Sequence, residues 1–122
     1  MGIPVKYFDE TTWAVNTINA TAANALTSTG SFCGLHIHNE NPTDVYVHIY
    51  NALAADVTVG TTAPIRSLEI PAGGSREESV PSMSEVPCST AISYAATNAL
   101  AGATFAGTAL SGKVFFKKLG LT

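Results

Sequence analysis

Residues 35–75 decide the fold of this chain and have the sequence LHIHNENPTDVYVHIYNALAADVTVGTTAPIRSLEIPAGGS. Aliphatic residues alternate with polar or aromatic ones in residues 32–39 and again in 44–51, and this period of two predicts β-strands. Turn-forming residues separate these two segments. A polar loop ends at Pro64, residues 65–70 form a further predicted strand, and a Pro-Ala-Gly-Gly turn follows. The stretch therefore indicates an all-β protein, and it contains no catalytic motif.

Further short strands are expected on the C-terminal side of this stretch. Residues 75–80 carry three charges in a row, which is typical of the edge of a sheet. Residues 88–97 and 112–119 read as two more strands, and a short one is expected around Phe105. About seven strands at these spacings predict a single antiparallel β-sandwich of the immunoglobulin-like or jelly-roll kind, spanning residues 31–122.

Residues 1–30 differ from the rest of the chain and predict an extended N-terminal arm with one or two edge strands. Threonine and asparagine oppose a helix in residues 11–30. Tyr7, Phe8 and Trp13 give the arm aromatic anchors. These anchors pack either onto the core of the chain itself or onto a neighbouring subunit, and the sequence leaves both alternatives open.

The two strands within the deciding stretch are predicted to pair with each other. An antiparallel pair that buries both aliphatic sets brings Leu35 opposite Ile49 and Ile37 opposite Val47. The intervening side chains then share the other face of the pair, and that face is a candidate interface: His36, His38, Tyr46, His48 and Tyr50.

The histidines on this predicted face also raise the question of a metal site. Three imidazoles on adjacent strands can hold zinc with one open position. Against this, the sequence offers no plain carboxylate partner to orient them. We therefore expect no metal and no cofactor. His36, His38 and His48 are the candidate ligands against which this expectation is checked. A pH-sensitive contact is another use of clustered histidines.

The composition favours a structural role over an enzymatic one. The chain has 122 residues, which is the size of one domain, with 46% hydrophobic but only 12% charged residues and a net charge of −3. Charge-poor surfaces are typical of interface cores, so we expect an assembly subunit. The charge balance argues against nucleic acid. No apolar run reaches the ~20 residues of a membrane helix, and the start has no signal-peptide core, so we expect no membrane insertion and no export.

Motifs of enzymes are missing from the sequence. No serine lies in a G-x-S-x-G pattern, and the glycine turn before Ser75 lacks the lysine of a phosphate-binding loop. Cys33 and Cys88 are either buried thiols or a disulfide between strands. We expect that the protein is not an enzyme.

Several turn and strand motifs lie within residues 32–119, and their residues are Leu35, Ile37, Asn39, Tyr50, Asn51, Thr58, Val59, Gly60, Thr61, Pro64, Leu68, Ile70, Pro71, Ala72, Gly73, Gly74, Ser89, Thr90, Ile92, Ser93, Ala95 and Thr97. Together these motifs resemble those of small virion proteins of tailed bacteriophages. The chain departs from the resemblance at Ala91, where the family usually has glycine.

The resemblance implies a small β-sandwich used in a virus particle, on the capsid, the tail or a fibre. Together with the low charge, the aromatic face, the arm-like N-terminus and the lack of catalytic motifs, it favours a capsid decoration or cement protein that binds and stabilises an assembled shell. Its partners would be the major capsid protein or other virion proteins, and it would form a homo-oligomer, with a trimer favoured. Its location would be the virion, assembled in the cytoplasm of the bacterial host. The alternative is a sugar- or receptor-binding module of a tail or fibre, in which Trp13, Tyr46 and Tyr50 stack on sugar rings. A metal-dependent enzyme built on the histidines is the third hypothesis.

Overall fold

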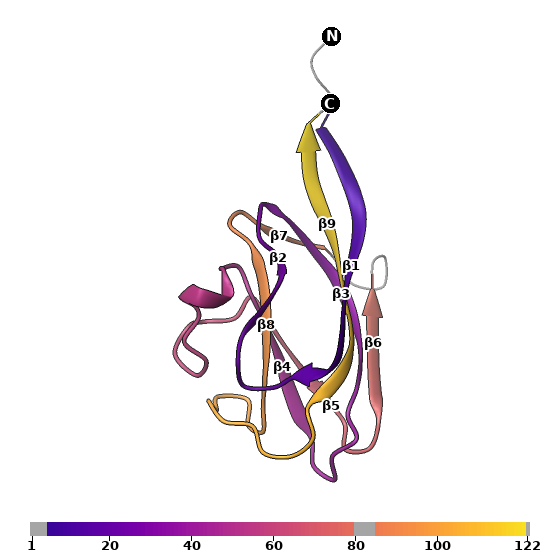
Figure 1. Ribbon diagram of the computed structural model, residues 1–122, viewed down its shortest axis with the longest axis vertical. Helices are drawn as coiled ribbons and strands as arrows, with labels where there is room; N and C mark the ends of the chain where they lie inside the picture. Colours follow the sequence, from indigo (N-terminus) through magenta and orange to yellow (C-terminus); the bar gives the residue numbers. More distant parts are fainter. Residues whose placement is uncertain (1–4, 80–84, 122) are drawn as a thin grey trace.

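The computed structural model describes residues 5–79 and 85–121, and for residues 5–10 and 119–121 it describes the backbone alone. The described residues form two antiparallel β-sheets and one short 3₁₀ helix, η1 (Ala54–Asp56), which confirms the predicted all-β sandwich (Figure 1). The strands are β1 (Val5–Ile18), β2 (Ala23–Leu26), β3 (Gly30–His38), β4 (Val45–Tyr50), β5 (Arg66–Ile70), β6 (Ser75–Ser79), β7 (Val86–Cys88), β8 (Ile92–Thr97) and β9 (Leu110–Leu121).

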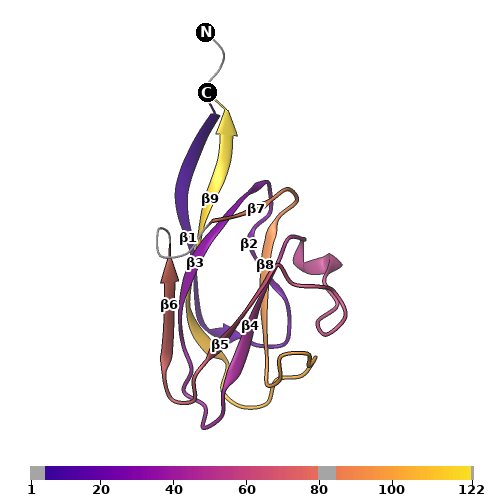
Figure 2. The same ribbon diagram turned by 180° about the vertical axis from the view of Figure 1, so that it is seen from behind.

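The two sheets lie face to face (Figure 2). One sheet has five strands. β1, β9, β3 and β6 follow one another in this order, and β7 pairs with residues 30–32 of β3, ahead of the part of β3 that pairs with β6. The other has four strands in the order β2-β8-β4-β5. The predicted strand over residues 88–97 is interrupted, because β7 ends at Cys88 in the first sheet and β8 begins at Ile92 in the second. Residues 98–109 contain no strand, so the one expected around Phe105 is not formed.

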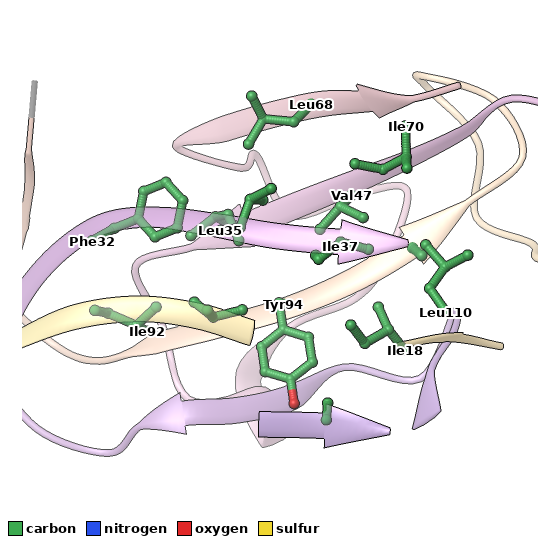
Figure 3. Close-up of a cluster of buried hydrophobic side chains, with 14 of the residues drawn as sticks. Ile18, Phe32, Leu35, Ile37, Val47, Leu68, Ile70, Ile92, Tyr94 and Leu110 are labelled. Atoms are coloured by element: carbon green, nitrogen blue, oxygen red, sulfur yellow. The ribbon is translucent and has the colours of Figure 1, made fainter. Parts of the chain in front are cut away.

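The hydrophobic core lies between the sheets and follows the alternation of the sequence. Leu35 and Ile37 of β3 point inward from one sheet, and Val47 of β4 points inward from the other (Figure 3). Burying these aliphatic side chains contributes roughly 25 cal/mol for each Å² removed from water. Other fully or almost fully buried members of the core are Ile18, Phe32, Val45, Ile49, Ile70, Ile92, Leu110 and Val114.

The predicted pairing of residues 32–39 with 44–51 is wrong. β3 pairs with β9, β6 and β7, whereas β4 pairs with β5 and β8. The connection between β3 and β4 carries the chain from one sheet to the other, so their aliphatic faces meet across the core. Alternation fixes which side of a strand faces inward, but it does not fix which strand lies beside it.

Asn39 and Asn41 organise the corner at which the chain changes sheet. Both side chains are buried. The Asn39 amide nitrogen donates to the carbonyl oxygens of Thr43, Ile70 and Pro71, at 2.9, 3.2 and 3.3 Å. Its oxygen accepts from the backbone N–H and the side-chain amide of Asn41, both at 2.9 Å. One asparagine therefore ties the corner to the end of β5.

A β-bulge at Cys33 shifts the register of β3 against β9. Phe32 lies opposite Phe116 and Gly34 lies opposite Phe115, which leaves Cys33 as the extra residue. The bulge explains why Phe32 and Leu35 both face the core although they are three positions apart. Gly34 adopts φ 138°, a value that side chains rarely allow.

The segment expected as an N-terminal arm contributes an edge strand to each sheet. β1 pairs with β9 along its length, and β2 pairs with β8. Ile18 and Leu26 are buried in the common core, so this part of the segment belongs to the sandwich. The start of β1 and the end of β9 project together as a two-stranded ribbon beyond the rest of the molecule (Figure 1). At its tip, Val5 lies opposite Leu121.

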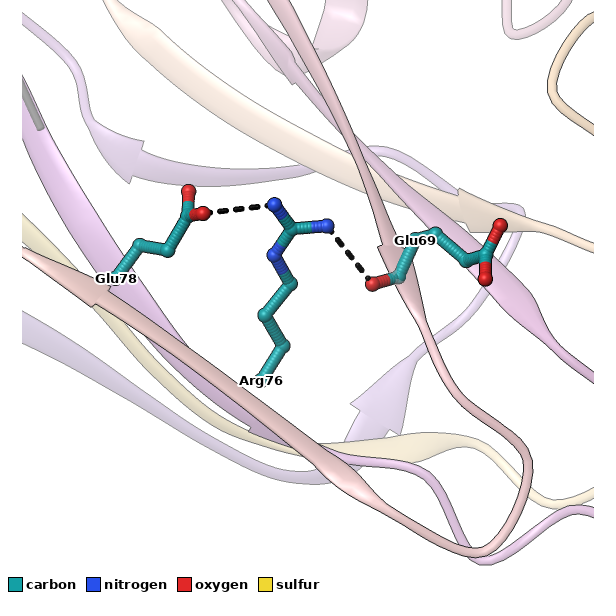
Figure 4. A network of polar contacts seen from close by, with 3 residues as sticks. All are labelled: Glu69, Arg76 and Glu78. Atoms are coloured by element: carbon teal, nitrogen blue, oxygen red, sulfur yellow. Dashed lines mark hydrogen bonds and ion pairs between the residues drawn. The ribbon is translucent and has the colours of Figure 1, made fainter.

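β6 is an edge strand, as its charges predict. Glu77 and Glu78 point to opposite sides, because Glu77 contacts His36 on the outer face whereas Glu78 contacts Arg76. Arg76 bridges the neighbouring edges of the two sheets (Figure 4). It donates to the Glu69 carbonyl oxygen of β5 at 3.1 Å and to the Glu78 carboxylate at 2.7 Å. The charged edge therefore also covers the open side of the core.

Candidate interaction surface and pocket

A row of four side chains crosses the outer face of the five-stranded sheet. The register places Trp13 of β1 beside Lys113 of β9, Lys113 beside His36 of β3, and His36 beside Glu77 of β6. The Lys113 ammonium lies 5.0 Å from the centroid of the Trp13 ring, a cation–π contact. His36 Nδ1 lies 3.2 Å from a carboxylate oxygen of Glu77. We call these four residues the Trp13 row.

The β1 end of the Trp13 row is apolar and exposed. The side chain of Trp13 is 58% exposed and that of Val15 is 50% exposed. Val15 lies in the irregularity between Ala14 and Ile18, where β1 leaves its regular pairing with β9. Large exposed apolar side chains beside a free sheet edge are typical of protein–protein contacts.

The predicted interface residues are divided between the two outer faces. His36 and His38 lie on the five-stranded sheet, and His38 Nδ1 is 2.8 Å from the Ser75 hydroxyl. His48 belongs to β4 on the other sheet, so the predicted common face does not exist. The side chains of Tyr7 and Phe8 lie outside the described residues.

The separation of the histidines also removes the candidate zinc site. His36 and His38 are on the opposite side of the sandwich from His48. Among the described residues, no three histidine, cysteine or acidic side chains lie close enough together to hold a metal ion.

The tyrosines do not form the stacking platform that a sugar-binding surface with Trp13 requires. Tyr46 and Tyr50 lie on the outer face of the four-stranded sheet, opposite Trp13. Tyr50 is only 1% exposed, and burial raises its pKa. Tyr46 is partly exposed beside Glu69, whose negative charge raises the pKa of the phenol.

His48 is the centre of a buried hydrogen-bond chain that the sequence did not indicate. Its Nε2 lies 2.8 Å from the Thr97 hydroxyl, and its Nδ1 lies 2.7 Å from the Ser67 hydroxyl. Thr97 donates its own hydrogen to the Ala99 carbonyl oxygen. Thr97 must therefore accept from His48 Nε2, and Nδ1 accepts from Ser67. The neutral imidazole on β4 is thus held in one tautomer between the two neighbouring strands, β5 and β8.

An open pocket of about 330 Å³ lies above this chain of hydrogen bonds. His48, Tyr50 and Ser67 line it from the outer face of the four-stranded sheet. Residues 60–64 and 100–102, from the two loops that cover this face, form its walls. The exposed side chain of Leu100 is part of the rim.

The connectivity of Ser67, His48 and Thr97 matches that of a nucleophile, a base and an orienting group. The chemical properties of the three residues do not match those roles. Burial lowers the pKa of His48, and the orienting group is a neutral hydroxyl. The lining of the pocket contains no carboxylate that would stabilise an imidazolium. The hydrogen bonds hold a neutral imidazole in a fixed orientation, and the arrangement is poorly suited to activating the Ser67 hydroxyl.

The depressed pKa of His48 predicts a pH-dependent stability. An unfolded chain takes up the proton near pH ~6.5, whereas the folded protein takes it up only at lower pH. The free energy of unfolding should therefore be highest above pH ~6.5 and decrease as the pH falls from there to the lowered pKa. Urea titrations across this range should show the decrease in the parent chain. The slope should be smaller in His48→Gln than in the parent chain, and an unchanged slope in His48→Gln would contradict the assignment.

The two cysteines are buried thiols. Cys33 lies in the bulge of β3 and Cys88 at the end of β7, and neither forms a disulfide. Burial raises the pKa of the Cys88 thiol. The Cys88 side chain packs in the hydrophobic core, and the Cys33 thiol donates to the Ser31 carbonyl oxygen at 3.5 Å.

These features define the chain as a two-sheet antiparallel β-sandwich with an exposed Trp13 row on one outer face and a small polar pocket on the other. Comparison with models of protein families, with curated proteins and with solved structures found no match. In the described part of the chain, no helix has the length and apolar character needed to cross a membrane.

Proposed function

We propose that this chain is a structural virion protein of a tailed bacteriophage, a capsid decoration or cement protein that binds the assembled shell. The observation that carries the proposal is the exposed apolar end of the Trp13 row beside the free edge of β1. The low charge and the resemblance over residues 32–119 support it. A protein that binds assembled but not free capsid subunits favours the assembled state by mass action.

The Trp13 row has the make-up of a binding hot spot. Tryptophan dominates the binding energy of many interfaces, and charged neighbours at the rim fix orientation. The ring is already held by Lys113, so little side-chain freedom is lost when it is covered. We propose that the outer face of the five-stranded sheet lies against the shell, with copies of the chain grouped as a trimer.

The experiment is the addition of purified protein to particles that lack it, followed by sedimentation and cryo-electron microscopy. A point substitution is preferred to a deletion of β1, because a deletion would also remove the buried side chain of Ile18. Trp13→Ala should instead weaken particle binding by about tenfold or more. The matched control is Leu100→Ala, since Leu100 is 60% exposed on the opposite face and should be dispensable.

The outcomes separate the hypotheses. Regular density on the shell with the five-stranded sheet facing inward would support the proposal. Binding unaffected by Trp13→Ala would exclude the Trp13 row as the contact. Absence of shell binding, with binding to tails or fibres, would replace the decoration role by the receptor-binding alternative. Analytical ultracentrifugation of the free protein would test the trimer.

A further inference from the structure

We propose that the pocket above His48 binds one ring of a neutral carbohydrate. The inference goes beyond the capsid role and does not depend on it. It rests on three properties of the pocket: the absence of charge in its lining, the combination of a polar floor with an apolar rim, and its opening to solvent.

The lining of the pocket selects for a neutral ligand. Its residues carry no carboxylate, lysine or arginine, and burial lowers the pKa of His48, which favours the neutral imidazole. A ligand with a full charge would lose hydration without gaining an ion pair. Sugars without carboxylate, phosphate or sulfate meet this condition.

The distribution of polar and apolar groups suits a sugar ring better than an apolar ring. The lining includes the hydroxyl-bearing residues Thr61, Thr62 and Ser67, and Ser67 keeps acceptor capacity after donating to His48. The rim presents Pro64 and Leu100, on which the C–H face of a pyranose can lie. A purely apolar ring would cover these polar side chains without offering them a hydrogen bond.

The size and position of the pocket agree with this ligand. A volume of about 330 Å³ is at the small end of the range for ligand pockets, which suits one ring rather than a long chain. The pocket opens on the outer face of the four-stranded sheet, away from the Trp13 row. A chain docked through Trp13 would therefore leave the pocket free to meet a glycan.

The test uses free sugars and the full chain. D-galactose, D-glucose and N-acetyl-D-glucosamine are titrated into ¹⁵N-labelled protein, with D-galacturonic acid as the charged counterpart of galactose. We expect saturable amide shifts for at least one neutral sugar, confined to residues 60–64, 100–102 and the neighbouring positions of β4 and β5. The expected Kd is on the order of 1 mM, and galacturonic acid should bind at least about tenfold more weakly.

Two variants place the binding in the pocket. Ala63→Glu puts bulk and charge on the wall and should abolish the shifts, whereas Ala55→Glu, an exposed alanine of η1 outside the lining, should leave them unchanged. Leu100→Ala should raise the Kd by about threefold, as expected for the loss of a partial apolar contact. Both Ala63→Glu and Leu100→Ala should retain particle binding through Trp13.

Several results would overturn the inference. Equal binding of galactose and galacturonic acid would contradict the argument from charge. Shifts caused by phenol but by none of the neutral sugars would assign the pocket to an aromatic side chain. Absence of saturable shifts at about ten times the expected Kd would remove the carbohydrate assignment, and it would leave the proposed contact with the shell untouched.

Discussion

Asn39→Ala should lower the free energy of unfolding by about 4 kcal/mol, a large share of the ~5–15 kcal/mol that stabilises a typical domain. The side chain is fully buried and bonds groups on both sides of the corner between the sheets. Alanine removes the donor that reaches the Thr43, Ile70 and Pro71 carbonyl oxygens. It also removes the acceptor for the Asn41 backbone N–H, and each buried group left unpaired costs about 1–3 kcal/mol.

The measurement is urea-induced unfolding followed by fluorescence and circular dichroism. The matched control is Asn24→Ala. Asn24 is exposed, and its oxygen accepts one hydrogen bond, from the Ala54 N–H at 2.8 Å. Its loss should cost less than about 1 kcal/mol. Equal effects of the two substitutions would mean that the corner network adds nothing beyond an ordinary surface hydrogen bond.

The role of Asn39 shows what the sequence could and could not predict. The alternation around Leu35 and Val47 identified the strands and their buried faces, because a period of two depends only on local geometry. The change of sheet between β3 and β4 depends on contacts between the corner and residues about 30 positions away, such as Ile70. A turn-rich loop of this length fits a hairpin and a sheet-crossing corner equally well.

The motifs of the phage resemblance turn out to be linked in space. Asn51 accepts a hydrogen bond from the Thr90 N–H at 2.9 Å, and its amide donates to the Ser89 hydroxyl at 3.3 Å. The Tyr-Asn and Ser-Thr motifs are therefore two halves of one loop contact. The motifs therefore have a structural role in holding two loops together. The function has to be inferred from the exposed surfaces, because a fold alone does not define a function.

The candidate sites were only partly predictable for the same reason. The exposure of Trp13 could be proposed from an aromatic residue in a polar segment. The burial of His48 could not, because alternation placed it on an outer face and gave no sign that two loops cover that face. The pocket forms between residues 60–64 and 100–102, which only the folded chain brings together.

Gly34→Ala should destabilise the protein by about 3 kcal/mol or more, and it is the second substitution with a large expected effect. Two costs combine at this position. The backbone has φ 138°, where an L-residue is strained. A Cβ atom would also lie 2.0 Å from the Glu78 carbonyl oxygen and 2.7 Å from the Ser79 Cα, both in the backbone of β6.

Gly73→Ala is the matched control, a glycine of positive φ without a close approach. Gly73 also has a positive φ, 64°, but a Cβ there would meet no atom within 4 Å. Its replacement should cost only about 1 kcal/mol, the usual penalty for alanine in a left-handed turn. The difference between the two variants measures the close approach of β6 to the bulge together with the greater backbone strain at φ 138°.

Thermal and urea unfolding of both variants provide the test, and amide exchange locates the effect. In Gly34→Ala, β6 must move away from β3, so amides of residues 75–79 should exchange faster, while those of β4 and β8 in the other sheet keep their relative protection. A Gly34→Ala protein as stable as Gly73→Ala would show that β3 relaxes around a side chain. The bulge would then form without requiring glycine at position 34.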